Sequence, residues 1–144
     1  MIVRKILKSK GTSITAVPVS EPIQKVAILL YEAEIGAVMV HDETLHPVGI
    51  LSERDIMRGI AENGASVLDA PARRLMTTHM ITCTPEDHVD ELMQVVTENR
   101  VRHLPVIERG HLAGIISIGD LVKARINELE SEGEALRNYI GTAM

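Results

Sequence analysis

Two short motifs place a carboxylate three residues after a serine hydroxyl. They are Ser52-Glu53-Arg54-Asp55 and Ser117-Ile118-Gly119-Asp120, and each follows an apolar run that contains Gly-Ile-Leu or Gly-Ile-Ile. Free N–H groups at the start of a helix attract phosphate, and an Asp one turn later can accept hydrogen bonds from a ribose diol. The same spacing is that of a capping box, in which Ser caps the helix and Asp bonds back to the N-cap N–H. One residue pair can serve both roles.

The two motifs occupy matching positions in an internal repeat. The segment GILSERDI at Gly49 to Ile56 returns 65 residues later as GIISIGDL at Gly114 to Leu121. Farther upstream, apolar residues with the spacing i, i+3, i+4, i+7 occur in both halves, which predicts one apolar face of a helix, written twice. These residues are Ile23, Val26, Ala27 and Leu30, and Val89, Leu92, Met93 and Val96.

Each of these helices is preceded by a start signal. Ser20 stands before Glu21-Pro22 and Thr84 before Pro85-Glu86, so both hydroxyls are predicted N-caps. Short helical leads are expected at Val3–Leu7 and Ala72–Met76, and a second helix follows each Ser-x-x-Asp motif. The predicted strands are Ile14–Val17, Ala37–Val40 and Val48–Leu51 in the first half, and Met80–Cys83, His103–Ile107 and Leu112–Ile116 in the second.

The predicted fold is α+β, with two pseudo-symmetric β-α-β-β-α repeats packed through their sheets. We expect residues 1–66 to form the first repeat and residues 67–127 the second. Because neither half alone can bury its apolar faces, the two halves are expected to pack on each other. Residues 128–144 are expected to form a helical tail. Leu129, Leu136 and Ile140 make a docking stripe on it, and Gly133 is its weak point.

Composition excludes several classes of function. The chain has 144 residues, a net charge of −5 and only Tyr31 and Tyr139 as aromatics, which argues against nucleic acid as a partner. Its apolar runs are too short to span a membrane. Cys83 is the single cysteine, so no internal disulfide is possible and a cytoplasmic location is expected. We find no HExxH, GxSxG, P-loop or GxGxxG motif, so we expect neither an enzyme nor a metal or catalytic cofactor.

Two copies of strand, helix, strand, Gly-apolar-apolar-Ser-x-x-Asp and helix resemble a tandem pair of cystathionine-β-synthase (CBS) domains. The resemblance covers residues 1 to about 127, and VRHLPV at Val101 to Val106 is especially typical of it. It implies a small stand-alone regulatory protein that binds adenosine-containing ligands in clefts between the paired repeats. Such modules often form disc-shaped homodimers.

The resemblance also implies roles for individual residues. Asp55 and Asp120 would hold the ribose hydroxyls, with Ser52 and Ser117 beside the ribose or phosphate. Backbone at Ile14 to Ala16 and Ile81 to Cys83 would meet the adenine edge. Other aliphatic residues would form the walls of the adenine site, although each of them is also a natural core residue. The remaining site residues are Val38 and Leu104 as walls, Arg102 and His103 on phosphate, Pro105 in the same motif, and Arg54, which stands where the second repeat has Gly119.

The function expected from this resemblance is sensing. AMP, ADP, ATP, NAD or S-adenosylmethionine would act as a regulatory ligand that shifts the module between conformations, and an unknown protein partner would distinguish them. A homodimer is expected because Ile56, Met57, Leu121 and Val122 would otherwise remain partly exposed. Two alternatives remain open, an adaptor with empty clefts and a nucleotide-hydrolysing enzyme.

Overall fold

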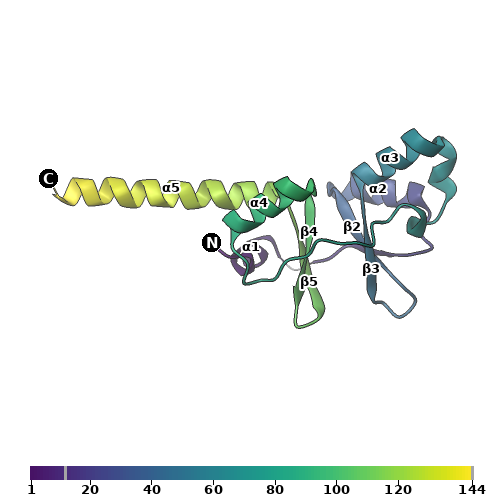
Figure 1. The fold of residues 1–144 in the computed structure, drawn as a ribbon, viewed down its shortest axis with the longest axis horizontal. Helices are drawn as coiled ribbons and strands as arrows, with labels where there is room; N and C mark the ends of the chain where they lie inside the picture. The colour runs from purple at the N-terminus through teal and green to yellow at the C-terminus, as the bar shows by residue number, and fades with distance from the viewer. Residues whose placement is uncertain (12, 144) are drawn as a thin grey trace. The chain divides into compact units, whose positions relative to one another are not determined.

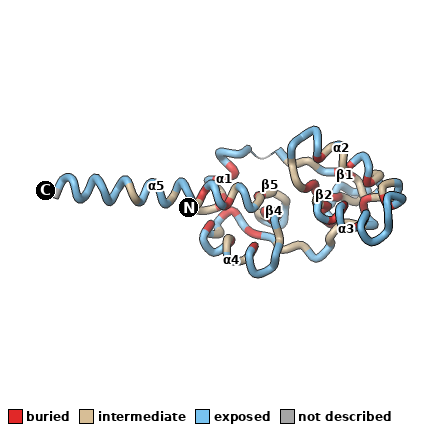
Figure 2. Tube along the Cα trace, turned by 90° about the horizontal axis from the view of Figure 1, so that it is seen from above, coloured by how far each residue is buried: buried red, intermediate tan, exposed pale blue. Residues whose placement is uncertain are grey.

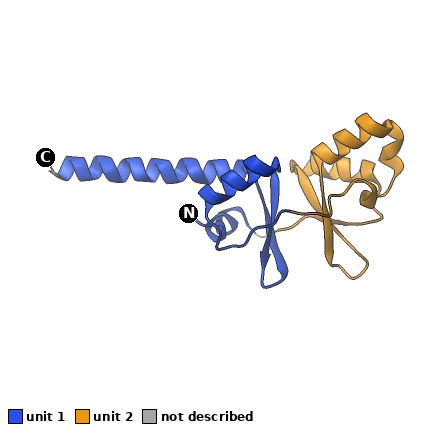
Figure 3. Cartoon of the chain, viewed as in Figure 1, with its two compact units in different colours: residues 1–12, 81–144 blue, residues 13–80 orange. Residues whose placement is uncertain are grey.

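The chain forms two compact units, which Figure 3 distinguishes by colour. The computed structural model describes residues 1–11 and 13–143. Unit 1 combines residues 1–12 with residues 81–144, and unit 2 holds residues 13–80. The N-terminal segment therefore packs with elements that follow it by some eighty residues of chain.

Unit 2 is built on a three-stranded sheet with the order β1-β2-β3. The first pair is parallel and the second is antiparallel. Helix α2 connects β1 to β2, and α3 follows β3 directly (Figure 1). Apolar residues of both helices belong to the core of this unit. The elements are β1 Ala16–Pro18, α2 Ile23–Ala33, β2 Ala37–His41, β3 Pro47–Ser52, α3 Glu53–Asn63, and the 3-10 turns η1 Ala65–Asp69 and η2 Ala72–Arg74.

Unit 1 repeats this plan with a smaller sheet, because only an antiparallel hairpin of β4 and β5 is formed. Helix α5 starts at the end of β5 and runs on past the other elements of its unit (Figure 1). It passes through Gly133 without a break. The elements are α1 Val3–Lys10, α4 Val89–Asn99, β4 His103–Glu108, β5 His111–Ser117 and α5 Ile118–Ala143.

The strand predicted at Met80–Cys83 is reduced to one parallel bridge between Cys83 and Val106. In unit 2 the N–H of Met39 donates to Thr15 O at 3.0 Å and so extends the pairing of β1. Pro105 occupies the equivalent position in unit 1 and has no N–H to donate. The ladder is therefore limited to Cys83, whose N–H donates to Pro105 O at 3.0 Å.

The predicted N-caps Ser20 and Thr84 were wrong, because α2 and α4 begin several residues later and have no side-chain cap. Their first N–H groups instead donate to backbone carbonyls from distant segments. Ile23 N bonds Ala70 O at 2.9 Å, and Val89 N bonds Met1 O at 3.0 Å. The prediction considered only hydroxyl groups close to each helix in the sequence, whereas the carbonyl acceptors belong to residues far away along the chain.

The lead segment of each repeat packs on the other repeat. In unit 1, α1 lies so close to β5 that a Cβ on Gly114 would stand 2.8 Å from Leu7 Cδ2. In unit 2, a Cβ on Gly49 would stand 2.9 Å from Met76 Sδ. At Gly49 the Cβ would also stand 3.0 Å from the backbone oxygen of Thr77, so glycine is required there, whereas at Gly114 a shift of the Leu7 side chain could make room. Because α1 packs against β5, the N-terminal segment belongs to the compact unit of the second repeat.

Two of the four apolar residues that the sequence predicts to be partly exposed are buried, and the other two are exposed. Ile56 and Leu121 are buried in the cores of units 2 and 1, respectively, whereas Met57 is 61% exposed and Val122 is 41% exposed. The α+β class and the two related repeats are confirmed. Within the described part of the chain, no helix has the length and apolar character that a membrane span requires.

Candidate functional site

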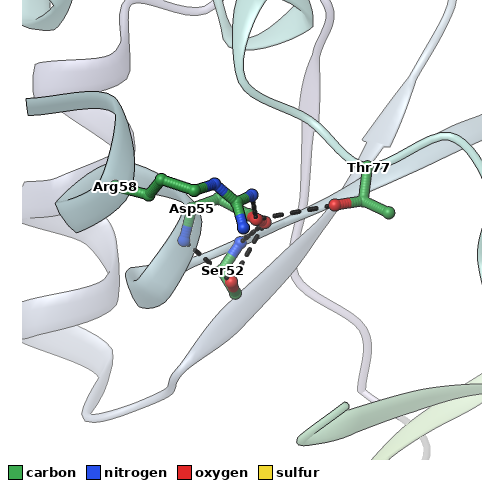
Figure 4. A network of polar contacts seen from close by, with 4 residues as sticks. All are labelled: Ser52, Asp55, Arg58 and Thr77. Atoms are coloured by element: carbon green, nitrogen blue, oxygen red, sulfur yellow. Dashed lines mark hydrogen bonds and ion pairs between the residues drawn. The ribbon is translucent and has the colours of Figure 1, made fainter. Parts of the chain in front are cut away.

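Ser52 and Asp55 form a complete capping box at the start of α3 (Figure 4). Ser52 Oγ accepts a hydrogen bond from Asp55 N at 3.2 Å, and Asp55 Oδ2 accepts from Ser52 N at 2.9 Å and from Ser52 Oγ at 3.0 Å. The geometry arises because β3 delivers Ser52 in an extended conformation directly into the helix. The capping role predicted for this motif is therefore realised.

The second carboxylate oxygen of Asp55 is also occupied. Arg58 Nη2, one turn along α3, donates to Oδ1 at 2.7 Å, and Thr77 Oγ1 approaches Oδ1 at 3.5 Å (Figure 4). Only 9% of the Asp55 side chain is exposed, against 61% for Arg58. A ribose that bonded Asp55 would have to replace one of these contacts.

Ser117 and Asp120 reproduce the box at the start of α5. Ser117 N donates to Asp120 Oδ2 at 2.8 Å, and Asp120 N donates to Ser117 Oγ at 3.1 Å. The cation at this site comes from α1, where Lys10 Nζ donates to Asp120 Oδ2 at 2.6 Å and to Ile115 O at 2.9 Å. Asp120 is 24% exposed, so its carboxylate is more accessible than that of Asp55.

The electrostatics of Asp120 favour the charged form. Partial burial by itself raises the pKa of this carboxyl, but the hydrogen bonds from Lys10 and Ser117 and the charge of Lys10 together outweigh burial. The net result is a pKa below the ordinary value for Asp. The site in unit 1 therefore holds an anionic acceptor at neutral pH.

The first turns of α3 and α5 retain little capacity for phosphate. Glu53 N donates to Gly36 O at 2.9 Å, and Ile118 N donates to Arg102 O at 2.8 Å. The third N–H of each helix is capped by the serine. Of the first three N–H groups, this leaves the second in each helix, at Arg54 and Gly119, without a cap from a described residue. Gly119 has no side chain to cover its own N–H, and a Cβ added there would meet only Ser117 Oγ, at 3.5 Å.

The phosphate-type residues of the two repeats lie near these motifs. His103 pairs with Ser117 in the β4–β5 register, so the structure brings these two predicted residues together. Arg102, directly before His103, is exposed, and so is Arg54 on α3. The corresponding strand position in unit 2 is Ala37, which pairs with Ser52.

The predicted adenine-contacting residues differ widely in burial. Val38 and Leu104 are completely buried in the cores of their units. Cys83 is 3% exposed, and burial, assisted by the charge of Asp87, raises the pKa of its thiol to about 12. Of the others in this set, Ile14 and Ile81 are half-buried and Ala16 is exposed. Pro105, predicted as part of the motif with Arg102 and His103, is buried.

Three contacts to the two aspartates were absent from the predicted site. Arg58 is three residues from Asp55 on a predicted helix, and this spacing is a usable signal. Lys10 is the last residue of α1 and lies 110 residues from Asp120, and Thr77 lies 22 residues from Asp55. No local pattern in the sequence reports a contact over such a separation.

Unit 1 also contains a groove of about 490 Å³ between α1 and the β4–β5 hairpin. Arg4 on its rim is held by Glu86 and, at 3.1 Å, by Glu108. None of the predicted site residues lines this groove. Among the described residues, no group of three or more His, Cys, Asp or Glu side chains could hold a metal ion.

Known proteins resemble both repeats of this chain. The model of the CBS domain family matches residues 3–62 and 72–127. CBS domain-containing protein CBSX3, mitochondrial, of Arabidopsis thaliana is 34% identical over 143 residues, which are 94% of this chain and 69% of that protein.

Two solved structures extend the comparison. A CBS-domain containing protein of Agrobacterium tumefaciens is 40% identical with a TM-score of 0.84, over 86% of this chain and 92% of that one. A CBS domain protein of Pyrobaculum aerophilum, complexed with AMP, is 27% identical with a TM-score of 0.76, over 91% of this chain and 99% of that one.

Proposed function

The chain belongs to the CBS domain family, with one matched segment in each repeat, and from this premise we propose that it is a regulatory module that binds an adenosine-containing ligand. AMP, ADP, ATP, NAD and S-adenosylmethionine share the adenosine that the Ser-x-x-Asp motifs would contact. The observation that carries the proposal is the anionic, partly exposed Asp120 in its box with Ser117. The AMP complex of the Pyrobaculum protein supports it.

In unit 1, Asp120 is the proposed acceptor for the ribose hydroxyls. Its Oδ2 already takes bonds from Ser117 N and Lys10 Nζ, so the diol would use Oδ1 or displace the lysine. Arg102 and His103, next to Ser117 in the hairpin, would contact phosphate, and Arg suits this role because its planar fork binds two oxygens. The adenine would contact backbone near Ile81.

Unit 2 offers a second and different site. Asp55 is more buried than Asp120 and is paired with Arg58, and Ala37 replaces the histidine beside the serine. Arg54 is an exposed cation on α3 that would contact phosphate there. We therefore propose that the two sites bind ligand with unequal affinity, the site of unit 1 being the stronger one.

Ligand binding would be read out through α1. A ribose that replaced Lys10 on Asp120 would remove the ion pair that joins the end of α1 to the start of α5. The ligand would then bind the conformation without this ion pair more tightly than the conformation with it, and such a difference in affinity is what a ligand-driven switch requires. The signal would pass to a protein target of unknown identity or to a second copy of the chain in a homodimer.

An adaptor role without ligand is the second candidate. It is favoured by the capping boxes, because both aspartates already have a structural role at a helix start. Neither proposal includes catalysis or a catalytic cofactor. A cytoplasmic location remains a prediction, and one relative is named as mitochondrial.

Calorimetry with the full chain distinguishes the two candidates. AMP, ATP, NAD and S-adenosylmethionine are titrated separately at millimolar concentration, with guanosine monophosphate as a control for nonspecific phosphate binding. The sensing proposal predicts saturable heat and a raised Tm for at least one adenosine ligand and none for the control. No heat and no Tm shift with all four adenosine ligands would contradict sensing and favour the adaptor.

A further inference from the structure

Helix α5 has two apolar faces, and only one of them is covered by unit 1. Leu121 and Ala124 are 0% and 5% exposed and belong to the unit 1 core. Most of α5 is exposed to solvent, as its pale blue colour in Figure 2 shows. The spacing of 3.6 residues per turn places a second apolar row on another side of the helix. This row consists of Val122, Ile126, Leu129, Leu136 and Ile140, which are 41%, 51%, 49%, 59% and 48% exposed, respectively.

The open row has the spacing of a coiled-coil seam. Beginning at Val122, its members follow one another at intervals of four and three residues, with Gly133 in the one position that lacks an apolar side chain. We call residues 122, 126, 129, 133, 136 and 140 the α5 seam. A strict repeat of seven residues keeps one stripe facing a partner helix in a left-handed supercoil. A helix that merely covers its own core needs no such repeat.

The side chains within the seam favour two strands. Ile126, Gly133 and Ile140 take the a positions of the heptad, and Val122, Leu129 and Leu136 take the d positions. Isoleucine at a with leucine at d is the combination that favours parallel dimers over larger assemblies. The seam is about 27 Å long at 1.5 Å per residue.

Charged residues flanking the seam distinguish the orientation of two helices. In a parallel, in-register pair, Arg125 faces Glu130 of the second copy and Glu132 faces Arg137 of the second copy, so both contacts are attractive. Arg125 also donates to Glu128 at 2.9 Å in its own helix, and its five N–H donors can serve both partners.

An antiparallel pair that kept the whole seam in contact would be opposed by the same charges. Glu132 would face Glu132 of the second copy, Glu130 would face Glu130, and Lys123 would face Arg137. All three contacts are repulsive. Charge complementarity therefore selects the parallel arrangement of two copies of this chain.

We infer that two copies of the chain associate through their α5 seams as a parallel, in-register coiled coil. This inference rests on the homodimer of the proposed function and assigns it a surface. The family match ends at residue 127, so most of the seam lies outside the matched segments. Gly133 leaves a gap in one layer, which makes the coil weak by itself and dependent on the concentration of the full chain.

Reversing one flanking charge tests the contact. Glu132→Arg places like positive charges opposite each other, because the new guanidinium faces Arg137 of the second copy. Glu134→Arg makes the same chemical change away from the seam on the same exposed helix. Sedimentation equilibrium over a dilution series is expected to show a dimer dissociation constant raised about tenfold for Glu132→Arg and unchanged for Glu134→Arg. The double variant Glu132→Arg/Arg137→Glu should regain parental affinity. Equal dissociation constants for all four proteins would overturn the inference.

Cysteine cross-linking tests orientation and register without any ligand. In the parallel coil Leu129 meets Leu129 of the second copy, whereas in the antiparallel pair it would meet Gly133. Leu129→Cys should therefore form an intermolecular disulfide rapidly under mild oxidation, and Ser131→Cys, on the outer face, should not. The native Cys83 is buried and does not compete. Equal cross-linking of the two variants would contradict the coil and leave the ligand proposal untouched.

Discussion

Lys10 and Asp120, separated by 110 residues in the chain, form an ion pair with a Nζ to Oδ2 distance of 2.6 Å. The pair joins the last turn of α1 to the first turn of α5. Asp55 in unit 2 is instead paired with Arg58 of its own helix. The two copies of the motif therefore share a capping box and differ in where the cation comes from.

This ion pair predicts a specific sensitivity to acid. Because the pKa of Asp120 is lowered in the folded chain, its contribution to the free energy of unfolding is present above the unfolded pKa of about 3.9. That contribution is lost as the pH falls through the folded pKa. Lys10→Met removes the main contacts that lower this pKa, so the variant should lose less stability than the parent between pH 6 and about pH 3.

Urea unfolding at a series of pH values measures the difference. Lys8→Met is the matched control, since Lys8 lies on the same helix and makes no ion pair among the described residues. Glu128, whose pKa is also lowered by the N-terminal amine and Arg125, contributes equally to all three proteins. Identical pH profiles for Lys10→Met and the parent would show that the pair has no role in stability.

Arg102 is predicted to contribute to affinity through phosphate alone. It is exposed, directly precedes His103, and is not part of either core. Arg102→Ala should weaken AMP or ATP binding about tenfold, because charge-assisted hydrogen bonds to phosphate are lost, and should leave adenosine binding nearly unchanged. Calorimetry with both ligands gives the ratio, with Arg74→Ala as a control in unit 2. A parallel loss for AMP and adenosine would argue against a phosphate contact.

Gly49, which lies against the lead segment of the second repeat, should tolerate alanine poorly. At Gly49 a Cβ would stand 2.9 Å from Met76 Sδ and 3.0 Å from the backbone oxygen of Thr77, and the backbone atom cannot easily move away. Gly49→Ala should cost about 1–3 kcal/mol of the free energy of unfolding. At Gly119 a Cβ would make only an ordinary contact with Ser117 Oγ, at 3.5 Å, so Gly119→Ala should be neutral or stabilising by up to about 1 kcal/mol. If Gly49→Ala and the parent have equal free energies of unfolding in urea, the lead segment does not pack closely against β3.

Much of the fold could be predicted because the relevant signals are local. The apolar spacing of α2 and α4, the two hairpins and the Ser-x-x-Asp boxes depend on residues within a few positions of one another. The helix starts were misjudged because Ala70 and Met1, far away in sequence, supply the acceptors. The strand at Met80–Cys83 failed because of Pro105 on a partner strand. Lys10 could not be assigned, since its partner is 110 residues away.

The roles of Asp120 as helix cap and as ribose acceptor can be separated by one substitution with a matched control. Asp120→Asn keeps a side-chain acceptor for the N–H of Ser117, so the free energy of unfolding without ligand should fall by no more than about 1 kcal/mol. Asp87→Asn is the control, because Asp87 Oδ2 likewise accepts from a backbone N–H three residues earlier, that of Thr84, at 2.8 Å, outside either motif.

The most direct measurement is the dissociation constant of AMP for the parent, Asp120→Asn and Asp87→Asn, obtained by calorimetry on the full chain. A ribose diol that loses its charged acceptor should bind about tenfold more weakly or worse. The account therefore predicts a loss of at least that size for Asp120→Asn and none for Asp87→Asn. If Asp120→Asn binds AMP as tightly as the parent while its stability falls, Asp120 is a helix cap only and the ligand site is assigned to the wrong residue.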